Sequence, residues 1–246
     1  MPSTAGKWAW MGLTLLWVPT QAQAPTAPQR EYLQYEIEWR LIRAGTAQVT
    51  WSGASQANLK LFSTGLVATL IKIEDVYTSN YEAGYCAMDS LMDAQEGRRH
   101  RETKVSFDRS RKKAFYLERD VLKNAVVSQK EIEIPPCVHD PLGALEKLRR
   151  HRLEVGQSWE LPVSDGKKLV SAKVECQEKE QIKTPAGTFS ALRHEAFLFN
   201  GVLYGRKGRL LIWFSDDERR LPVQIRIQMP FYVGTVTLQL EKLERT

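Results

Sequence analysis

The chain has 246 residues, of which 43% are hydrophobic and 26% are charged, and its formal net charge is +6. Such a composition excludes an intrinsically disordered protein, because disordered chains combine low hydrophobicity with high net charge. The length allows one large all-β domain or two smaller ones, with a substantial buried core.

The N-terminal segment is typical of an export signal peptide. Lys7 supplies the positive charge, an apolar stretch follows at residues 8–18, and small residues at 20–24 form the cleavage zone. We expect residues 1–22 to be removed, because cleavage after Ala24 would place Pro25 beside the scissile bond. An uncleaved N-terminal anchor is the alternative. The mature chain is then expected to be periplasmic or secreted, with no transmembrane span and no nucleic-acid partner.

Three cysteines lie in a chain that is expected to reach an oxidising compartment. We expect a disulfide between Cys86 and Cys137, because both lie in segments predicted to be irregular. Cys176 continues the apolar face of a strand and is expected to be buried and free. Spacing alone leaves the other pairings open. No two cysteines or histidines have the spacing of metal ligands, so we expect no metal site and no cofactor.

Alternating apolar and polar residues predict antiparallel strands in the first half of the chain. After a linker at residues 23–30, a strand is predicted at 33–41, Gly45 is expected to permit a turn, and a second strand follows. Residues 58–77 are predicted to form two strands broken near Gly65, with an apolar helical turn as the alternative. Residues 85–97 are the segment most typical of a loop. Strands return on both sides of a turn at residues 108–112.

One helix is predicted, at residues 140–151. Asp140 suits the N-cap and Pro141 the first helical position, and leucines then recur along one side of the helix. A second set of alternating strands follows. Residues 164–167 predict a two-residue hairpin of type I′, and residues 184–187 predict a further turn.

These patterns predict a mainly β protein. We expect one large antiparallel domain over residues 31–246, barrel-like or a sandwich, with one short helix. Two β subdomains at residues 31–138 and 153–246, joined by the helix at 140–151, are the alternative.

Four segments resemble a family of exported bacterial proteins known as domain of unknown function 3108. They read YEIEWRLIRAGTAQV, HDPLGALEKLRRHRLEVGQSWELPV, IKTPAGTFSALRHE and IWFSDDERRLPVQI. The resemblance spans nearly all of the mature chain, and it implies an exported, β-rich envelope protein without an established reaction or ligand. The chain departs from the family pattern at His139 and at residues 145–147. The strongest matches are residues 184–189 and the group Trp213, Asp217, Arg220, Leu221 and Pro222.

Asp216, Asp217 and His194 are the candidate residues of an envelope-polymer hydrolase. A catalytic carboxylate pair requires one acid with a raised pKa, whereas adjacent arginines would keep both acids ionised. Neighbouring residues at a turn also point in different directions. We therefore interpret residues 215–220 as a reversal between two strands, in which Asp217 and Arg220 form a structural strut. An enzyme is the less favoured class, and no G-x-S-x-G motif is present.

Basic and aromatic residues supply the candidate contacts to a ligand or surface. An arginine cluster could hold lipid phosphates, although it could equally protect an edge strand from pairing. Tryptophans on predicted strands could line a cavity for an apolar or sugar ligand, although they could equally fill the core. The candidates are Arg98, Arg99, Arg101, Trp39, Trp51 and Trp213.

Export, alternating strands and the lack of a catalytic motif favour a non-enzymatic cell-envelope protein. We expect it to bind an apolar or anionic amphiphile or to act in envelope assembly, with a lipid or glycan of the envelope as its partner. The alternatives are the hydrolase and a protein-interaction scaffold that uses an exposed strand edge.

Overall fold

The computed structural model describes residues 30–197, 208–229 and 234–246, so the expected signal peptide lies outside the described residues. Two helices are described, α1 (Gly65–Leu70) and α2 (Pro141–Arg150). The described strands are β1 (Arg30–Trp39), β2 (Ile42–Ser52), β3 (Gln56–Ser63), β4 (Ile73–Glu82), β5 (Cys86–Glu96), β6 (Arg99–Asp108), β7 (Lys113–Asp120), β8 (Ala125–Glu133), β9 (Ser158–Ser164), β10 (Leu169–Thr184), β11 (Gly187–Ala196), β12 (Arg209–Ser215), β13 (Pro222–Gln228) and β14 (Thr235–Arg245).

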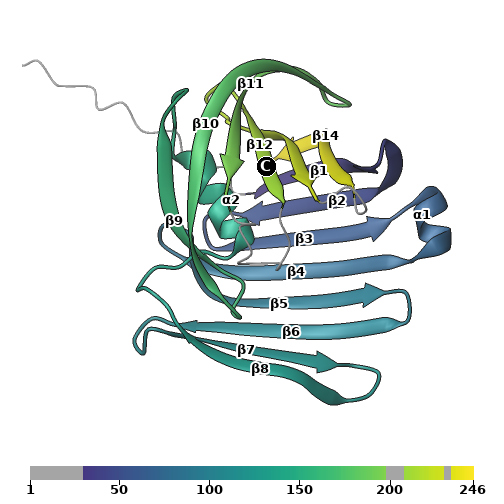
Figure 1. Cartoon of the computed structure of the whole chain (residues 1–246), viewed down its shortest axis with the longest axis vertical. Coiled ribbons are helices and arrows are strands. Elements are labelled where there is room, and N and C mark those ends of the chain that lie inside the picture. The colour runs from purple at the N-terminus through teal and green to yellow at the C-terminus, as the bar shows by residue number, and fades with distance from the viewer. Residues whose placement is uncertain (1–29, 198–207, 230–233) are drawn as a thin grey trace, which may run out of the picture.

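All described strands belong to one antiparallel sheet. Its order is β8-β7-β6-β5-β4-β3-β2-β1-β14-β13-β12-β11-β10-β9, so the first and last described strands pair in its middle. The sheet curls, and β9 and β10 run steeply across one end of the flatter array formed by β2 to β8 (Figure 1). The predicted fold class, a mainly β and barrel-like antiparallel domain with a short helix, is confirmed.

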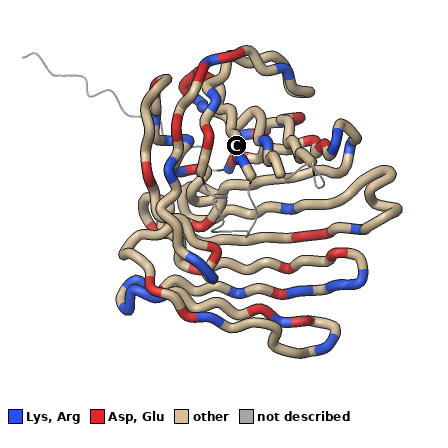
Figure 2. The backbone as a smooth tube through the Cα atoms, viewed as in Figure 1, with Lys and Arg blue, Asp and Glu red and all other residues tan. Residues whose placement is uncertain are grey.

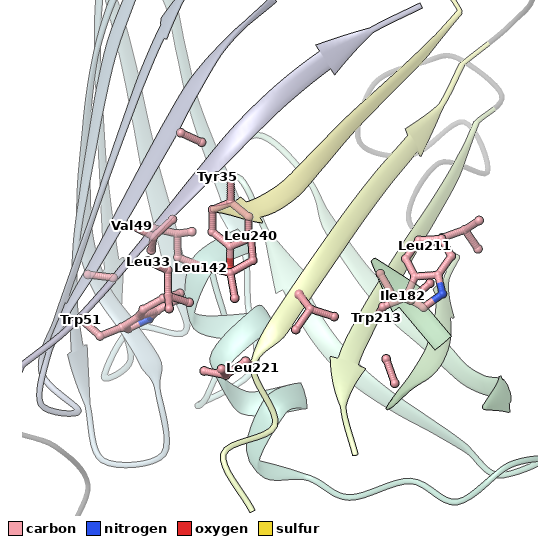
Figure 3. Close-up of a cluster of buried hydrophobic side chains, with 14 of the residues drawn as sticks. Leu33, Tyr35, Val49, Trp51, Leu142, Ile182, Leu211, Trp213, Leu221 and Leu240 are labelled. Carbon is pink, nitrogen blue, oxygen red and sulfur yellow. The ribbon is translucent and has the colours of Figure 1, made fainter. Parts of the chain in front are cut away.

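The core lies on the inner face of the curl, around α2. Leu142 of α2 belongs to a cluster with Leu33 and Trp51, whereas Leu148 belongs to a second cluster on β9 to β12. Figure 3 shows the first cluster, whose side chains come from both halves of the sheet. Leu145 packs against both clusters, so α2 joins the two halves of the sheet through buried apolar contacts.

The predicted start of α2 is confirmed. Asp140 is the N-cap residue, and its carboxylate accepts a hydrogen bond from the amide of Gly143 at 2.8 Å. The hydroxyl of Tyr77 donates to the same carboxylate at 2.6 Å. The cap therefore satisfies a free helix amide and ties α2 to β4.

The predicted turn at Gly45 is wrong. The chain reverses at Arg40 and Leu41, both with positive φ, and Gly45 lies within β2. A Cβ atom at Gly45 would clash with the carbonyl oxygen of Phe62. Glycine is thus required here by the close approach of β3 and not by a turn.

Three further local predictions are corrected by the structure. Residues 65–70 form α1, the alternative to the favoured strand, and residues 86–96 form β5 instead of a loop. The ladders that β4 and β6 provide on both sides of β5 compensate for its weak alternation. The hairpin after β9 pairs Ser164 with Leu169 and so has a four-residue loop, because the Asp165 carboxylate accepts hydrogen bonds from the amides of Lys167 and Lys168.

Candidate functional site

The charged turn between β12 and β13 stabilises the fold. The Asp217 carboxylate accepts hydrogen bonds from the Ser215 hydroxyl at 2.8 Å, the Arg219 guanidinium at 2.8 Å and the Arg220 amide at 3.0 Å. The side chain of Arg220 is buried and donates to the carbonyl of Arg149 in α2 at 2.7 Å. Asp217 and Arg220 therefore both hold the turn, but no side-chain ion pair joins them as the strut interpretation expected.

The candidate hydrolase residues do not converge. Asp216 pairs with Lys179 at 2.6 Å and with Arg152 at 3.0 Å, and the hydrogen bond from Lys179 lowers the pKa of its carboxyl. His194 is fully buried against the ring of Phe214, and burial lowers its pKa to about 4. No hydrogen bond between described residues joins His194 to Asp216. An ionised, half-buried acid held between two basic residues and a neutral core histidine do not form an acid–base pair.

The candidate tryptophans mainly fill the core. Trp51 and Trp213 are 4% and 2% exposed and belong to the first apolar cluster, where Figure 3 shows them on opposite sides. The indole of Trp213 donates to Glu180 at 2.6 Å. Trp39 is half-buried at the end of β1, beside the guanidinium of Arg40. Trp51 and Trp213 are therefore too deeply enclosed to contact a ligand at the surface.

The candidate arginines lie at the turn between β5 and β6, but they do not act together. Arg98 and Arg99 are exposed, and Arg99 approaches Glu96 at 3.9 Å. Arg101 is half-buried and pairs with Asp120 of β7 at 3.3 Å. Only Arg98 and Arg99 are therefore available to a large anionic partner.

The turn at Arg98 is one of four that lie at the same end of the sheet. Strands β1 to β8 follow one another as neighbours, so every second turn falls at the same end. We define the tip surface as the four turns at residues 40–41, 64–72, 97–98 and 121–124. Hydrogen bonds link these turns to neighbouring strands or turns, including one from the Gly97 amide to the carbonyl of Lys72 at 2.7 Å and one from the Val121 amide to His100 at 3.0 Å.

The tip surface combines basic and apolar residues. Each of its four turns contains one basic residue, and none contains an acid. Figure 2 shows Lys and Arg positions, in blue, at turns along this end of the strands. Leu41 is 94% exposed, Leu70 82%, and Leu66 and Leu122 70% each. The turns at the opposite end of β2 to β7, residues 53–55, 83–85 and 109–112, contain no exposed large apolar residue. The basic residues are Arg40, Lys72, Arg98 and Lys123.

Two of these basic side chains, Arg98 and Lys123, form no ion pair with a described acid. Lys72 pairs with Glu74 at 3.0 Å, in an exposed contact that contributes little stability. The turns at 97–98 and 121–124 therefore carry unpaired positive charge, the first beside the apolar turns of the tip surface and the second on a turn that is itself apolar.

Sequence reasoning missed the tip surface because its apolar residues continue strand patterns. Leu41 extends the alternation of β1, and Leu66 and Leu70 were expected in strands. The sequence nevertheless contained a signal for this surface. A large apolar side chain within or beside a turn cannot reach the core and is therefore expected to be exposed.

The cysteines, the possible metal ligands and the helices offer no further candidate site among the described residues. The structure contains the expected disulfide between Cys86 and Cys137, and Cys176 is free and buried. The described residues include no group of three His, Cys, Asp or Glu side chains that could hold a metal ion. In the same part of the chain, the helices are too short or too polar to cross a membrane.

Comparisons with known proteins identify a family and a fold. A family model described as "Protein of unknown function (DUF3108)" matches residues 34–241. No curated protein matches the chain. A solved β-barrel-like protein of domain of unknown function DUF1849 from Brucella abortus aligns with a TM-score of 0.55 at 9% identity, covering 88% of this chain and 98% of the other. A DUF1089 family protein from Pseudomonas aeruginosa aligns with a TM-score of 0.30 at 11% identity, covering 89% and 94%. The first likeness shows a shared fold alone.

Proposed function

This chain belongs to the DUF3108 family of proteins of unknown function, and we propose a function for it from the residues exposed on its own surface. It is a non-enzymatic, exported envelope protein that binds anionic lipid bilayers through the tip surface. The bound amphiphile is a membrane surface and not a molecule enclosed in the curl, because buried apolar side chains of the described strands pack around α2 on the inner face.

One observation supports this proposal: exposed leucines and unopposed cations share adjoining turns. A basic residue close to an anionic bilayer contributes about 1 kcal/mol of attraction, which salt screens. Exposed apolar side chains at the same level can enter the boundary between headgroups and acyl chains. Neither feature alone distinguishes a membrane surface from ordinary solvent-exposed turns. Together they predict that the sheet stands end-on with its four turns in the interface.

Vesicle binding tests the proposal. The full chain without its signal peptide is sedimented with vesicles of phosphatidylglycerol and phosphatidylethanolamine, and with vesicles of phosphatidylcholine alone. We expect binding to the anionic vesicles and at least tenfold weaker binding to the neutral ones. Added salt should weaken the binding, because it screens the positive turns. Equal binding to both vesicles, or none to either, would contradict the proposal.

Matched variants locate the binding surface. Arg98→Gln with Lys123→Gln removes two charges from the tip surface, whereas Arg111→Gln with Lys112→Gln removes two charges from the opposite end. Only the first pair should weaken binding, by about tenfold or more if each charge contributes about 1 kcal/mol. Leu70→Gln should also weaken it, whereas Val155→Gln, at an exposed apolar residue outside the tip surface, should not.

A further inference from the structure

The two edges of the sheet differ in how they are covered. At the β9 edge, the amide of His139 donates to the Pro162 carbonyl at 3.0 Å, and the amide of Ser164 donates to the His139 carbonyl at 2.9 Å. Pro162 has no amide of its own to expose. β8 pairs with β7 on one side, and no described strand pairs with its other side. β8 is therefore the edge at which another strand could be added.

The register identifies which groups of β8 are open. The amide of Ile134 donates to the Lys112 carbonyl at 2.9 Å, so residue 134 directs its main-chain groups toward β7. Because these groups alternate along an antiparallel strand, those of Gln129, Glu131 and Glu133 face the free edge. The side chains of the same three residues are exposed. Main-chain pairing and side-chain recognition would thus use the same residues.

A hollow in the sheet ends at these residues. It has a volume of about 630 Å³ and crosses β5 to β8 between two rows of side chains on the outer face. One row joins Leu117 to Gln129, and the other joins Phe115 to Glu131. Leu91, Val105 and Tyr116 also belong to the lining. A side chain of an added strand opposite Gln129 would lie at the open end of this hollow.

The negative charge on the exposed face of β8 favours a basic partner strand. Lys113 contacts Glu131 and lies opposite Glu133 in the register. One positive charge therefore lies beside two negative charges on this face. Pairing two copies of this chain antiparallel about Glu131 would bring the glutamates of both copies together, which is unfavourable. A basic strand would instead neutralise the surplus acid. Lys130 and Ile132, which point to the other face, favour an acidic and an apolar neighbour.

We propose that the free edge of β8 binds an extended, basic peptide segment of another protein as an added antiparallel strand. In this arrangement two basic residues lie opposite Glu133 and Glu131, and a large apolar residue lies opposite Gln129 beside the hollow. From its N-terminus, the segment reads basic, apolar, basic, acidic, apolar. This surface is separate from the tip surface, and the proposal does not depend on membrane binding.

A synthetic peptide containing Arg-Val-Lys-Glu-Phe, with blocked ends and a fluorescent label, is the probe. Its binding to the full chain is measured by anisotropy in the absence of lipid. In the proposed register the amides of the arginine, lysine and phenylalanine donate to β8, whereas those of the valine and glutamate face away. N-methylation of the lysine amide should therefore abolish binding, and N-methylation of the glutamate amide should leave it within about twofold. Equal effects of the two modifications, or no binding of the unmodified peptide, would overturn the proposal.

Protein variants provide a second measurement. Glu131→Lys with Glu133→Lys should weaken peptide binding at least tenfold, whereas Glu218→Lys, a charge reversal in the distant β12–β13 turn, should not. Circular dichroism establishes that each variant is folded. If the variant with Glu131→Lys and Glu133→Lys binds the peptide as tightly as the unmodified chain, β8 is not the binding edge. Self-association of the unmodified chain that these substitutions abolish would indicate a second copy as the occupant and would also overturn the proposal.

Discussion

Arg149 and Arg220 each donate a hydrogen bond to the main-chain carbonyl of the other. Arg149 Nε lies 2.9 Å from the Arg220 oxygen, and Arg220 Nε lies 2.7 Å from the Arg149 oxygen. Arg149 also pairs with Glu31 of β1 and donates to the Arg219 carbonyl at 2.8 Å. Burial opposes the charge of Arg149, but the hydrogen bond and charge of Glu31 raise the pKa of Arg149 above its ordinary value. One guanidinium thus joins α2, the middle of the sheet and the β12–β13 turn.

Replacing Arg149 should strongly destabilise the protein. Arg149→Met leaves Glu146 and Glu31 buried with fewer cations and leaves two carbonyls without a donor, so we expect a loss of about 3–5 kcal/mol in the free energy of unfolding. Urea denaturation measures this loss. Arg152→Met is the control, because Arg152 is half-exposed and its ion pairs with Glu154 and Asp216 should contribute less than about 1 kcal/mol. Similar losses for the two variants would contradict the assigned role of Arg149.

Asp75 should make the stability depend on pH. Burial, together with the nearby charge of Glu96, raises the pKa of Asp75 to about 6 in the folded protein, above its ordinary value of 3.8. Because the folded state binds this proton more tightly than the unfolded state, Asp75 favours folding increasingly as the pH falls from about 7 toward 4. The contribution is on the order of 2 kcal/mol across this window, and it is lost as the pH rises through 6.

Asp75→Asn tests this dependence. Asparagine keeps an oxygen that can accept the hydrogen bond from the Gln95 amide, but it carries no charge. The variant should be more stable than the parent chain at pH 7.5, and the two should converge near pH 4. Thermal unfolding at a series of pH values measures the difference, with Asp89→Asn as an exposed control on β5. A constant difference between Asp75→Asn and the parent chain at every pH would refute the titration.

Gly143 lies inside α2, where alanine would ordinarily stabilise a helix by about 1 kcal/mol. Here a Cβ atom would lie 2.7 Å from the Asp140 carboxylate, 2.8 Å from the ring of Tyr81 and 3.0 Å from the carbonyl of Tyr85. Gly143→Ala should therefore displace the N-cap and cost roughly 1–3 kcal/mol. Denaturant unfolding measures the change, and a gain in stability would show that the cap tolerates the methyl group.

Local predictions succeeded where a local cause acts. The Asp140 cap and the Pro141 start of α2 depend on residues within one helical turn, and the structure has them as predicted. Gly45 shows the opposite case, because its requirement comes from Phe62 on another strand. β5 was missed for the same reason: its hydrogen bonds come from neighbours on both sides, which its own pattern does not reveal.

The amino-acid sequence alone therefore determined the alternating strands and the helix with its cap, since these depend on spacing over a few residues. The resemblance of four longer segments indicated the family. Only the tertiary structure decided that β1 and β14 meet in the middle of the sheet and that α2 packs against both halves of the curl. It also decided that the side chain of Arg220 donates to Arg149 and not to Asp217. It also gathered Leu41, Leu70, Leu122 and the basic residues of four separate turns at one end. The physical reason is that strand pairing joins residues far apart in the chain. The order of paired strands determines which turns lie at the same end of the sheet and which strand edges face solvent.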